Sequence, residues 1–307
     1  MMKTKRHTQQ SVACKRFLLR VLLTAFLFVA MAVCGGCDMP LSDTHTEALP
    51  AEGTARVTYL DAGQADATLI QSDKGHAVLI DTGLKENADN LVSDLRRLGV
   101  EKINVLVLTH GHADHMGGAI TVMEAFPVEK IYISPQARSA NFYKKTLETI
   151  DKRNIPAEIP KFGSNFAVDD LNFTVVGPVD TAEQEKVNNS SIVLRMTHGN
   201  DAFLFPADAE KKEENDMMGA GANLSCDVLK VGHHGSKTSS SEDFLTLCGS
   251  RCKIAVISMG ADNEYGLPHD KTLKALSRHH MTVYRTDRNG DITVLSTGSG
   301  VSVTTEK

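Results

Sequence analysis

The sequence predicts an α/β protein with two β-rich halves, each flanked by helices. Short runs such as 77–80 and 105–108 are apolar throughout and rich in β-branched residues, which is typical of strands buried on both faces. Segments such as 87–98 carry leucine at helical spacing, which is typical of helices that cover a sheet. A chain of 307 residues with 41% hydrophobic content can bury one large core, so we expect a single domain over 55–307.

Residues 1–37 have the composition of an export signal. Residues 1–20 contain several Lys and Arg and no acid, and 21–33 are apolar apart from one Thr. A basic segment followed by an apolar segment of this length is typical of a signal for secretion. We therefore exclude this segment from the fold.

Cys37 follows two glycines, which resembles the cleavage site of a bacterial lipoprotein and predicts that Cys37 is lipidated. An uncleaved anchor over 17–33 is the alternative, because that length is just enough to span a membrane. Both interpretations predict an extracytoplasmic, membrane-anchored domain. The polar residues 38–54 are expected to form a flexible tether.

Net charge and cysteine content limit the possible partners. The formal net charge of -5 argues against binding nucleic acid through bulk charge, although a local basic patch stays possible. Beyond the leader the chain keeps Cys226, Cys248 and Cys252 without a C-x-x-C pair, so a zinc–thiolate site is not expected. A disulfide between Cys248 and Cys252 and free buried thiols both remain open.

The first half of the domain is predicted to begin with a meander of strands at 56–61, 67–71 and 77–80. A helix at 87–98, ended by Gly99, leads to the buried strand 105–108. The remaining elements expected in this half are helices at 117–126 and 141–154, strands at 131–133 and 171–176, and a loop at 160–170.

The second half is predicted to alternate strands with short helices. His198 lies between two strands and is interpreted as part of a hairpin turn. The predicted strands end at Met196, Asp208 and His233, and others span 254–258, 281–287, 291–296 and 301–305. Helices are expected at 241–247, where Ser241 is a suitable N-cap, and at 270–280.

The run His110-Gly-His112-Ala-Asp114-His115 directly follows strand 105–108. The carboxyl end of a buried strand is where α/β sheets carry their chemistry. Imidazole and carboxylate groups suit zinc, manganese or iron, and this run is too dense for one tetrahedral site that keeps an open position. We expect two adjacent metals, with His110 and His112 on one and Asp114 and His115 on the other. A histidine-rich surface turn without metal is the alternative.

A second pair of histidines, His233 and His234, also ends a strand. Because side chains alternate along a strand, the two rings are not expected to face the metals equally. We interpret His233 as a metal ligand and His234 as a neighbour that acts on the substrate. Ser236 and Lys237 supply a hydroxyl and an ammonium that suit a phosphate oxygen, although the Ser-rich run also fits a helix cap.

The H-x-H-x-D-H run after a hydrophobic strand resembles the metallo-β-lactamase superfamily. Three further segments, 61–66 (D-A-G-Q-A-D), 188–194 (N-N-S-S-I-V-L) and 233–236 (H-H-G-S), resemble the extracytoplasmic metallo-β-lactamase-like domain of the ComEC competence protein family and its stand-alone relatives. The resemblance covers roughly residues 55–298 and implies an αββα sandwich, the metallo-β-lactamase fold.

The resemblance also implies roles for single residues. Asp208 matches the carboxylate that bridges both metals, and Asp81 matches an aspartate that orients a ligand histidine. Asp61 and Asp66 are expected to shape the floor of the site without binding metal. His269 lies in a segment similar to the family's Y-G-H-P-H loop and is the candidate for the last metal ligand, with a structural role before a helix as the alternative.

Two metals on one carboxylate lower the pKa of a bridging water from 15.7 toward about 7, so hydrolysis through a metal-bridged hydroxide needs no protein nucleophile. Asp114, Asp208 and His234 are the candidate catalytic residues. We expect two divalent ions, zinc or manganese, as cofactors. The sequence contains no glycine pattern of a nucleotide site, so no nucleotide cofactor is expected.

We expect a surface phosphodiesterase or nuclease acting on nucleic acid or cell-wall teichoic acid, the substrates proposed for relatives of this group. The alternatives are a β-lactamase and a non-enzymatic accessory of DNA uptake.

Overall fold

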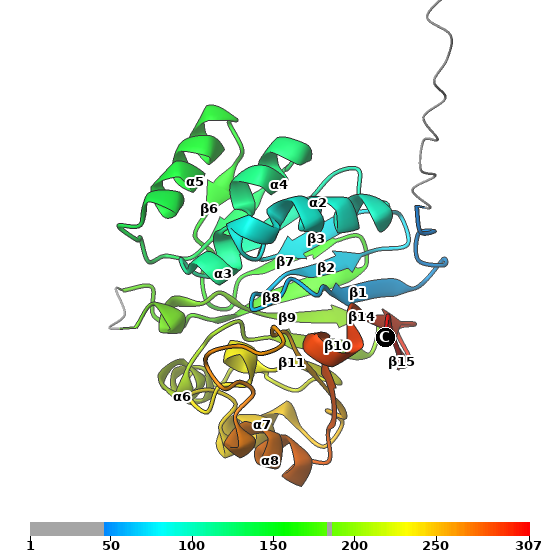
Figure 1. Ribbon diagram of the computed structural model, residues 1–307. Helices are drawn as coiled ribbons and strands as arrows, with labels where there is room; N and C mark the ends of the chain where they lie inside the picture. The colour runs from blue at the N-terminus through cyan, green and yellow to red at the C-terminus, as the bar shows by residue number, and fades with distance from the viewer. Residues whose placement is uncertain (1–45, 183–185) are drawn as a thin grey trace, which may run out of the picture. The chain divides into compact units, whose positions relative to one another are not determined.

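Two β-sheets lie face to face, and each is covered on its outer face by helices (Figure 1). The computed structural model describes residues 46–182 and 186–307. Within these residues the predicted αββα sandwich is confirmed. The predicted export signal, Cys37 and residues 38–45 of the expected tether lie outside the described residues.

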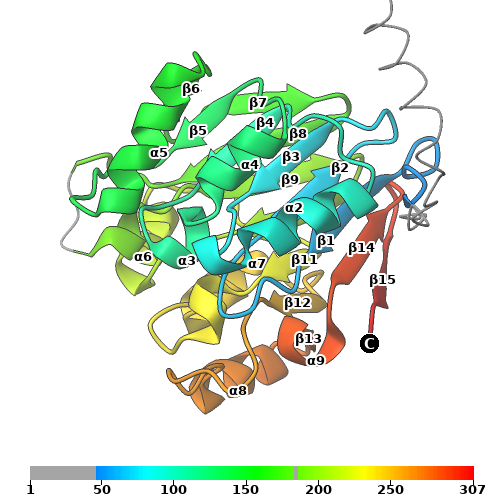
Figure 2. The same ribbon diagram turned by 45° about the horizontal axis from the view of Figure 1, so that its top comes forward.

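The first sheet has eight strands in the order β15-β14-β1-β2-β3-β4-β5-β6. The predicted meander is confirmed, because β1–β2 and β2–β3 pair antiparallel, whereas β3, β4 and β5 are parallel. The strands are β1 (Ala55–Tyr59), β2 (Thr68–Gln71), β3 (Ala77–Ile80), β4 (Val105–Leu108), β5 (Ile131–Ile133), β6 (Ala157–Glu158), β14 (Ile292–Ser296) and β15 (Val301–Thr305). Figure 2 shows the helices over this sheet: α2 (Ala88–Arg97), α4 (Ala119–Ala125) and α5 (Asn141–Lys152), with the short α3 (Ala113–Met116) after β4.

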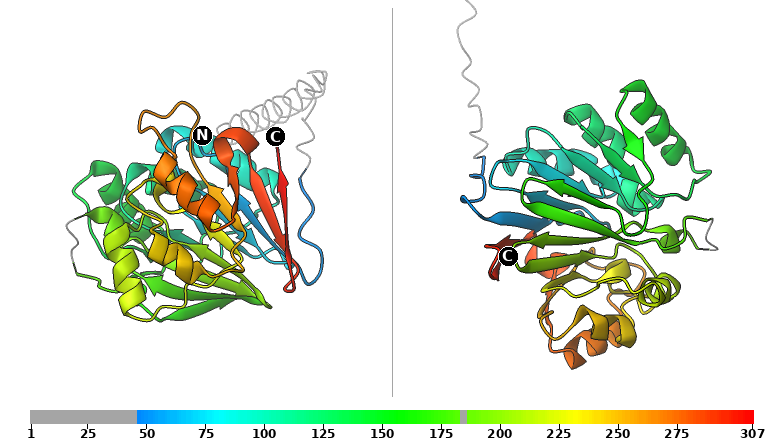
Figure 3. Two further views of the ribbon diagram at one scale, coloured as in Figure 1. Left: turned by 90° about the horizontal axis from the view of Figure 1, so that it is seen from below. Right: turned by 180° about the vertical axis from the view of Figure 1, so that it is seen from behind.

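The second sheet has seven strands in the order β13-β12-β11-β10-β9-β8-β7. They are β7 (Asn165–Val168), β8 (Leu171–Gly177), β9 (Val193–His198), β10 (Asp201–Phe205), β11 (Val228–Lys230), β12 (Ile254–Ile257) and β13 (Thr282–Arg285). Its helices α6 (Lys211–Gly219), α7 (Glu242–Cys248) and α8 (Asp270–Arg278) cover the face opposite the first sheet (Figure 3), and the short α9 (Thr286–Asn289) follows β13. The 3-10 turns are η1 (Lys85–Asn87), η2 (Val187–Ser190) and η3 (Gly232–Gly235).

The main apolar core lies between the two sheets and contains Tyr59, Phe173 and Phe203, all of them fully buried. A second apolar cluster lies between the first sheet and its helices, and a third lies between the second sheet and its helices. Strands buried on both faces explain why the runs at β3, β4 and β10 are apolar without alternation. Because both faces of these strands are packed, the polar residues that form the candidate site lie at the strand ends.

Besides the short α3, β6 and α9, the last of which begins inside the predicted strand 281–287, the structure contains two larger elements that were not predicted. Strand β7 occupies part of the predicted loop 160–170, where it is a short, largely exposed strand at the edge of the second sheet. Helix α6 was not predicted, because its inward face carries Glu213 and Glu214 instead of an apolar stripe. Both carboxylates accept hydrogen bonds from backbone amides, Glu214 with both oxygens and Glu213 with Oε1 only.

The described end of the expected tether contacts the domain. The carboxylate of Glu47 pairs with Arg56 on β1 and with Arg97 on α2, and its amide donates to the carbonyl of Arg97. Over residues 46–182 and 186–307, no helix has the length and apolar character needed to cross a membrane. The three cysteines at 226, 248 and 252 are buried free thiols.

Candidate metal centre

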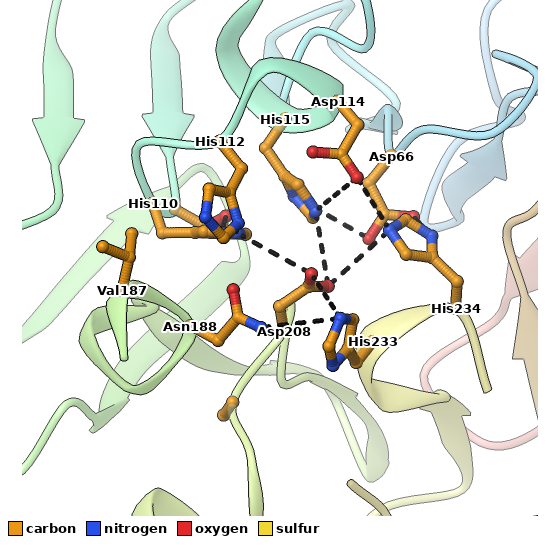
Figure 4. A network of polar contacts seen from close by, with 12 residues as sticks. Asp66, His110, His112, Asp114, His115, Val187, Asn188, Asp208, His233 and His234 are labelled. Atoms are coloured by element: carbon orange, nitrogen blue, oxygen red, sulfur yellow. Dashed lines mark hydrogen bonds and ion pairs between the residues drawn. The ribbon is translucent and has the colours of Figure 1, made fainter. Parts of the chain in front are cut away.

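Seven of the predicted site residues converge at the carboxyl ends of three strands that belong to both sheets (Figure 4). His110, His112, Asp114 and His115 follow β4 of the first sheet. Asp208 follows β10, and His233 and His234 follow β11, in the second sheet. Segments that are about a hundred residues apart in the sequence therefore form one site.

Asp208 is buried at the centre of this site and faces a different set of imidazoles with each carboxylate oxygen. Its Oδ2 lies 3.7 Å from Nε2 of His110 and 3.5 Å from Nε2 of His233. Its Oδ1 lies 3.3 Å from Nε2 of His115 and 3.8 Å from Nε2 of His234. This is the arrangement that a carboxylate shared by two ions requires.

The first set of donors contains His110, His112 and Asp208, whose donor atoms lie within 4.8 Å of one another. Nε2 of His110 and Nδ1 of His112 are 3.1 Å apart. His233 borders this set, and its Nδ1 lies 2.9 Å from Oγ1 of Thr238. When Nδ1 donates to that hydroxyl, the free electron pair of Nε2 points toward Asp208. Asn188 lies beside the same ring, with Nδ2 at 3.5 Å from Nε2 of His233.

The second set contains Asp66, His115, Asp208 and His234, again with donor atoms within 4.8 Å. Asp114 borders it, with Oδ2 at 3.9 Å from Nε2 of His115 and 3.3 Å from Nε2 of His234. The two sets share Asp208, so each can hold one ion. The grouping of His110 with His112, and of Asp114 with His115, is the one expected from the spacing.

Asp81 positions His115 and the end of β4. Its Oδ2 accepts from Nδ1 of His115 at 2.7 Å and from Oγ1 of Thr109 at 2.7 Å, and its Oδ1 accepts from the amide of Thr109 at 2.8 Å. These bonds leave Nε2 of His115 free to face Asp208. The turn after His115 needs glycine, because a Cβ on Gly118 would lie 2.3 Å from the carbonyl oxygen of Thr82.

The histidine pair departs from the prediction based on strand alternation. His233 and His234 lie beyond the end of β11 and both have left-handed backbone, with φ of 52° at each residue. Alternation therefore does not apply, and both rings face Asp208. The Nδ1–H of His234 donates to the carbonyl of Ser258 at 2.9 Å, which directs its Nε2 into the second set. His234 thus lies among the metal-ligand candidates and is not only a neighbour.

Asp66 was expected to shape the floor of the site without binding metal, but the structure places it in the second donor set. Its partner, Lys230, was not predicted from the sequence. Nζ of Lys230 lies 2.9 Å from its Oδ1 and 3.0 Å from its Oδ2. Both side chains are buried. The sequence did indicate that such a partner exists, because Lys230 lies in the otherwise apolar run 228–231 and a buried lysine needs an acidic partner.

Other predicted site residues lie outside the two donor sets. Asp61 is exposed and pairs with Lys307 at 3.5 Å, because β1 ends before it and directs it toward the C-terminal strands. His269 precedes α8, and its Nδ1 accepts from the amide of Lys237 at 3.2 Å, which places its ring beside the Ser-rich loop. Ser236 is buried and bonds Oγ1 of Thr238 at 3.0 Å, whereas Lys237 is exposed.

The charges of the site favour cations. Burial raises the pKa of Asp208, but His115 and His234 outweigh burial and hold that pKa well below its usual range. Burial lowers the pKa of His115, but Asp208, Asp81 and Asp114 together raise it well above its usual range. Burial and the neighbouring His115 lower the pKa of His110 well below its usual range, which keeps its ring neutral as a ligand must be.

Three buried polar atoms that face one another have no hydrogen-bond partner: Oδ1 of Asp208, Nε2 of His115 and Nε2 of His234. Unpartnered buried donors and acceptors are rare in proteins unless an ion or a water satisfies them. The donor chemistry of imidazole and carboxylate fits divalent metals. The site therefore fits metal ions.

Comparisons with known proteins agree with this site. A model of the metallo-β-lactamase superfamily matches residues 60–258. ComE operon protein 3 of Bacillus subtilis is 34% identical over 261 residues, which cover 80% of this chain and 33% of that protein. Competence protein ComA of Neisseria gonorrhoeae is 33% identical over 246 residues, which cover 80% of this chain and 32% of that protein. The chain thus spans about a third of the length of these curated relatives.

Among solved structures, the metallo-β-lactamase fold protein YhfI from Bacillus subtilis superposes with a TM-score of 0.50 at 14% identity, covering 79% of this chain and 99% of that one. This likeness supports the fold. Together with the match over residues 60–258 and the histidine–aspartate site, it leads to one conclusion. The chain belongs to the metallo-β-lactamase superfamily and is similar to its competence-protein branch.

Proposed function

We propose that this protein is a dinuclear metal-dependent phosphodiesterase of the cell envelope. The observation that carries the proposal is the position of Asp208, which presents one oxygen to His110 and His233 and the other to His115 and His234. A carboxylate in this position can hold two ions close together.

The first ion would be held by His110, His112, Asp208 and His233, and the second by Asp114, His115, Asp208 and His234. When bound, two divalent ions such as Zn²⁺ or Mn²⁺ supply Lewis acidity and allow water to act as a nucleophile at neutral pH. The protein's own contribution is to orient the rings. Asp81 fixes His115, the carbonyl of Ser258 fixes His234, and Thr238 fixes His233.

Two features beside the site support a substrate that carries both phosphate groups and nucleobases. Lys237 is exposed three residues after His234 and can attract a phosphate. Tyr265 is 70% exposed and lines a pocket of about 400 Å³ that also contains Asp114. An exposed aromatic ring next to a catalytic centre is a platform on which a nucleobase can stack. These features, and the similarity to proteins named for competence, favour nucleic acid over teichoic acid.

We further propose that the domain acts outside the cytoplasm, anchored through Cys37. This part rests on the N-terminal sequence alone. A non-enzymatic accessory of DNA uptake is the competing proposal, and metal content separates the two, because a protein that only binds DNA has no need of two ions.

The decisive experiment combines metal analysis with a substrate screen on purified protein. The substrates are bis-p-nitrophenyl phosphate, p-nitrophenyl-phosphorylcholine, single-stranded DNA and a cephalosporin. We expect two metals per chain and turnover of DNA and of the simple diester. One or no metal, or preferential turnover of the cephalosporin, would overturn the proposal, and preferential turnover of the phosphorylcholine ester would reassign the substrate.

A further inference from the structure

A second pocket, of about 160 Å³, lies beside the candidate metal centre and collects three lysines. Each comes from a different element: Lys211 begins α6, Lys237 lies in the Ser-rich loop 236–241, and Lys271 lies in the first turn of α8. They are distant in the sequence, so their convergence is a property of the fold. Of these three lysines, only Lys237 was expected from the sequence to contact the substrate.

The loop that forms the floor of this pocket is held by hydrogen bonds from both helices. The amide of Lys211 donates to the carbonyl of Thr238 at 2.9 Å. The hydroxyl of Thr272 on α8 donates to the carbonyl of Ser236 at 3.1 Å. Glu214 on α6 accepts from the amides of Ser240 and Ser241. These bonds tie together the three segments that carry the lysines.

The pocket is cationic. Among residues 46–182 and 186–307, no ion pair involves Lys211, Lys237 or Lys271. Of the two acids that line the pocket, Glu242 pairs with Arg278 and, at 3.2 Å, with His279. Asp243 is the second acid, and Glu214 behind the loop is engaged by the amides of Ser240 and Ser241, so the three lysines share the pocket lining with two carboxylates, one of them already paired. A chain with a net charge of -5 thus has a local basic site next to its candidate catalytic centre.

One side chain separates this pocket from the metal centre. Thr238 lines the pocket, and its Oγ1 lies 2.9 Å from Nδ1 of His233. Nε2 of the same ring lies 3.5 Å from Oδ2 of Asp208. A ligand that spans Thr238 would therefore place one anionic group at the metals and the next one among the lysines.

We propose that the pocket of Lys211, Lys237 and Lys271 is a second phosphate subsite, which binds the phosphate adjacent to the scissile one in a single nucleic-acid strand. The inference rests on the proposed phosphodiesterase function and deepens it, because the pocket makes a strand a better substrate than an isolated diester. Ammonium groups bind phosphates as point charges without reading bases, so the subsite is expected to be independent of sequence.

The test compares the double variant Lys211→Ala/Lys271→Ala with wild type and with Lys274→Ala. Lys274 is an exposed lysine on α8 outside the pocket, so its variant removes charge from the same helix. Binding of a fluorescent single-stranded DNA with hydrolysis-resistant phosphorothioate linkages to the metal-loaded protein is measured by anisotropy. We expect the Kd of the double variant to rise at least fivefold, and the slope of log Kd against log salt to fall by about 1. Lys274→Ala is expected to behave as wild type.

Turnover supplies the second measurement. The ratio of kcat/KM for single-stranded DNA to kcat/KM for bis-p-nitrophenyl phosphate is expected to fall at least fivefold in the double variant. An unchanged Kd and an unchanged ratio, or an equal loss with Lys274→Ala, would overturn the subsite. If wild type hydrolyses neither substrate, the phosphodiesterase proposal fails, and the binding experiment still decides whether the pocket holds a strand.

Discussion

Nζ of Lys230 lies 2.9 Å from Oδ1 and 3.0 Å from Oδ2 of Asp66, although the two residues are 164 positions apart. Both side chains are almost fully buried, and the pair lies beside His115 and His234. Burial raises the pKa of Asp66, but Lys230, His234 and His115 outweigh burial and lower it. The ammonium of Lys230 therefore keeps a carboxylate charged inside the site.

Replacing this ammonium should destabilise the fold. Lys230→Met leaves the Asp66 carboxylate buried without its partner, which costs about 3 kcal/mol of unfolding free energy. The double variant Asp66→Asn/Lys230→Met is expected to recover at least half of this loss. Denaturant unfolding measures the change, and Lys253→Met, at an exposed lysine before β12, is the control. A loss below about 1 kcal/mol would show that the pair contributes little.

His112→Ala should lower the metal content and abolish hydrolysis while the sheets stay folded. The ring of His112 is half-buried and contacts His110, so its removal takes away a donor and leaves the apolar core intact. Mass spectrometry of bound metal, an assay with bis-p-nitrophenyl phosphate and circular dichroism measure the metal content, the hydrolysis and the fold. His76→Ala, at a hairpin of the first sheet, is the control. Full activity with unaltered metal stoichiometry would contradict the dinuclear site.

Lys237→Ala should act on phosphodiesters selectively. Phosphodiesters are expected to be turned over at least tenfold better than β-lactams in kcat/KM, which corresponds to about 1.4 kcal/mol of transition-state binding. Loss of the ammonium should narrow this gap, because an uncharged lactam gains less from it. Parallel assays with single-stranded DNA and nitrocefin measure the ratio, because only a strand carries a second phosphate that can reach the pocket of Lys237. An equal effect of the variant on both classes would argue against a phosphate contact.

Glu213 should make the stability of the fold depend on pH. Burial raises the pKa of this carboxyl from 4.5 to about 7, against the opposing hydrogen bond from the amide of Val179. Between these pH values the folded state keeps a proton that the unfolded state has lost, so the unfolding free energy falls as pH rises from about 4.5 to 7. Glu213→Gln should therefore stabilise the protein by roughly 1–2 kcal/mol more at pH 8 than at pH 5.

Thermal or denaturant unfolding at both pH values measures this difference. The control is Glu148→Gln on the exposed face of α5. A Glu213→Gln profile parallel to that of wild type would show that another group governs the pH dependence.

Cys37→Ser tests the proposed anchor. We expect the variant to leave the membrane fraction or to accumulate as an unprocessed precursor, because the lipid attachment is lost. Cell fractionation and intact mass measure both outcomes. A variant with unchanged fractionation and mass would indicate an ordinary uncleaved anchor.

The sequence allowed the strand ends to be predicted, and with them most of the site. His110, His112 and Asp208 follow apolar runs whose direction in the chain is readable, and the carboxyl ends of such strands meet at one edge. The positions of His233 and His234 were not readable, because two successive left-handed residues replace the alternation assumed for a strand.

Long-range partners were also beyond sequence reasoning. Lys230 in an apolar run indicates that an acidic partner exists, but which acid it contacts depends on how the two sheets stack. The position of His269 depends on the loop before α8, which directs the ring toward the amide of Lys237. Ser236 illustrates the same limit, since its hydroxyl is engaged inside its own loop.

The donors of the candidate metal centre are divided between the two sheets, with Asp66 and the residues after β4 on the first sheet and the residues after β10 and β11 on the second. Bound ions would therefore act as a cross-link across the interior of the sandwich. Ligands that bind only the folded state add about 2.7 kcal/mol of stability at a hundredfold excess over Kd. The concentration of free metal around the protein would then determine how long the folded chain survives proteolysis as well as how fast it turns over its substrate.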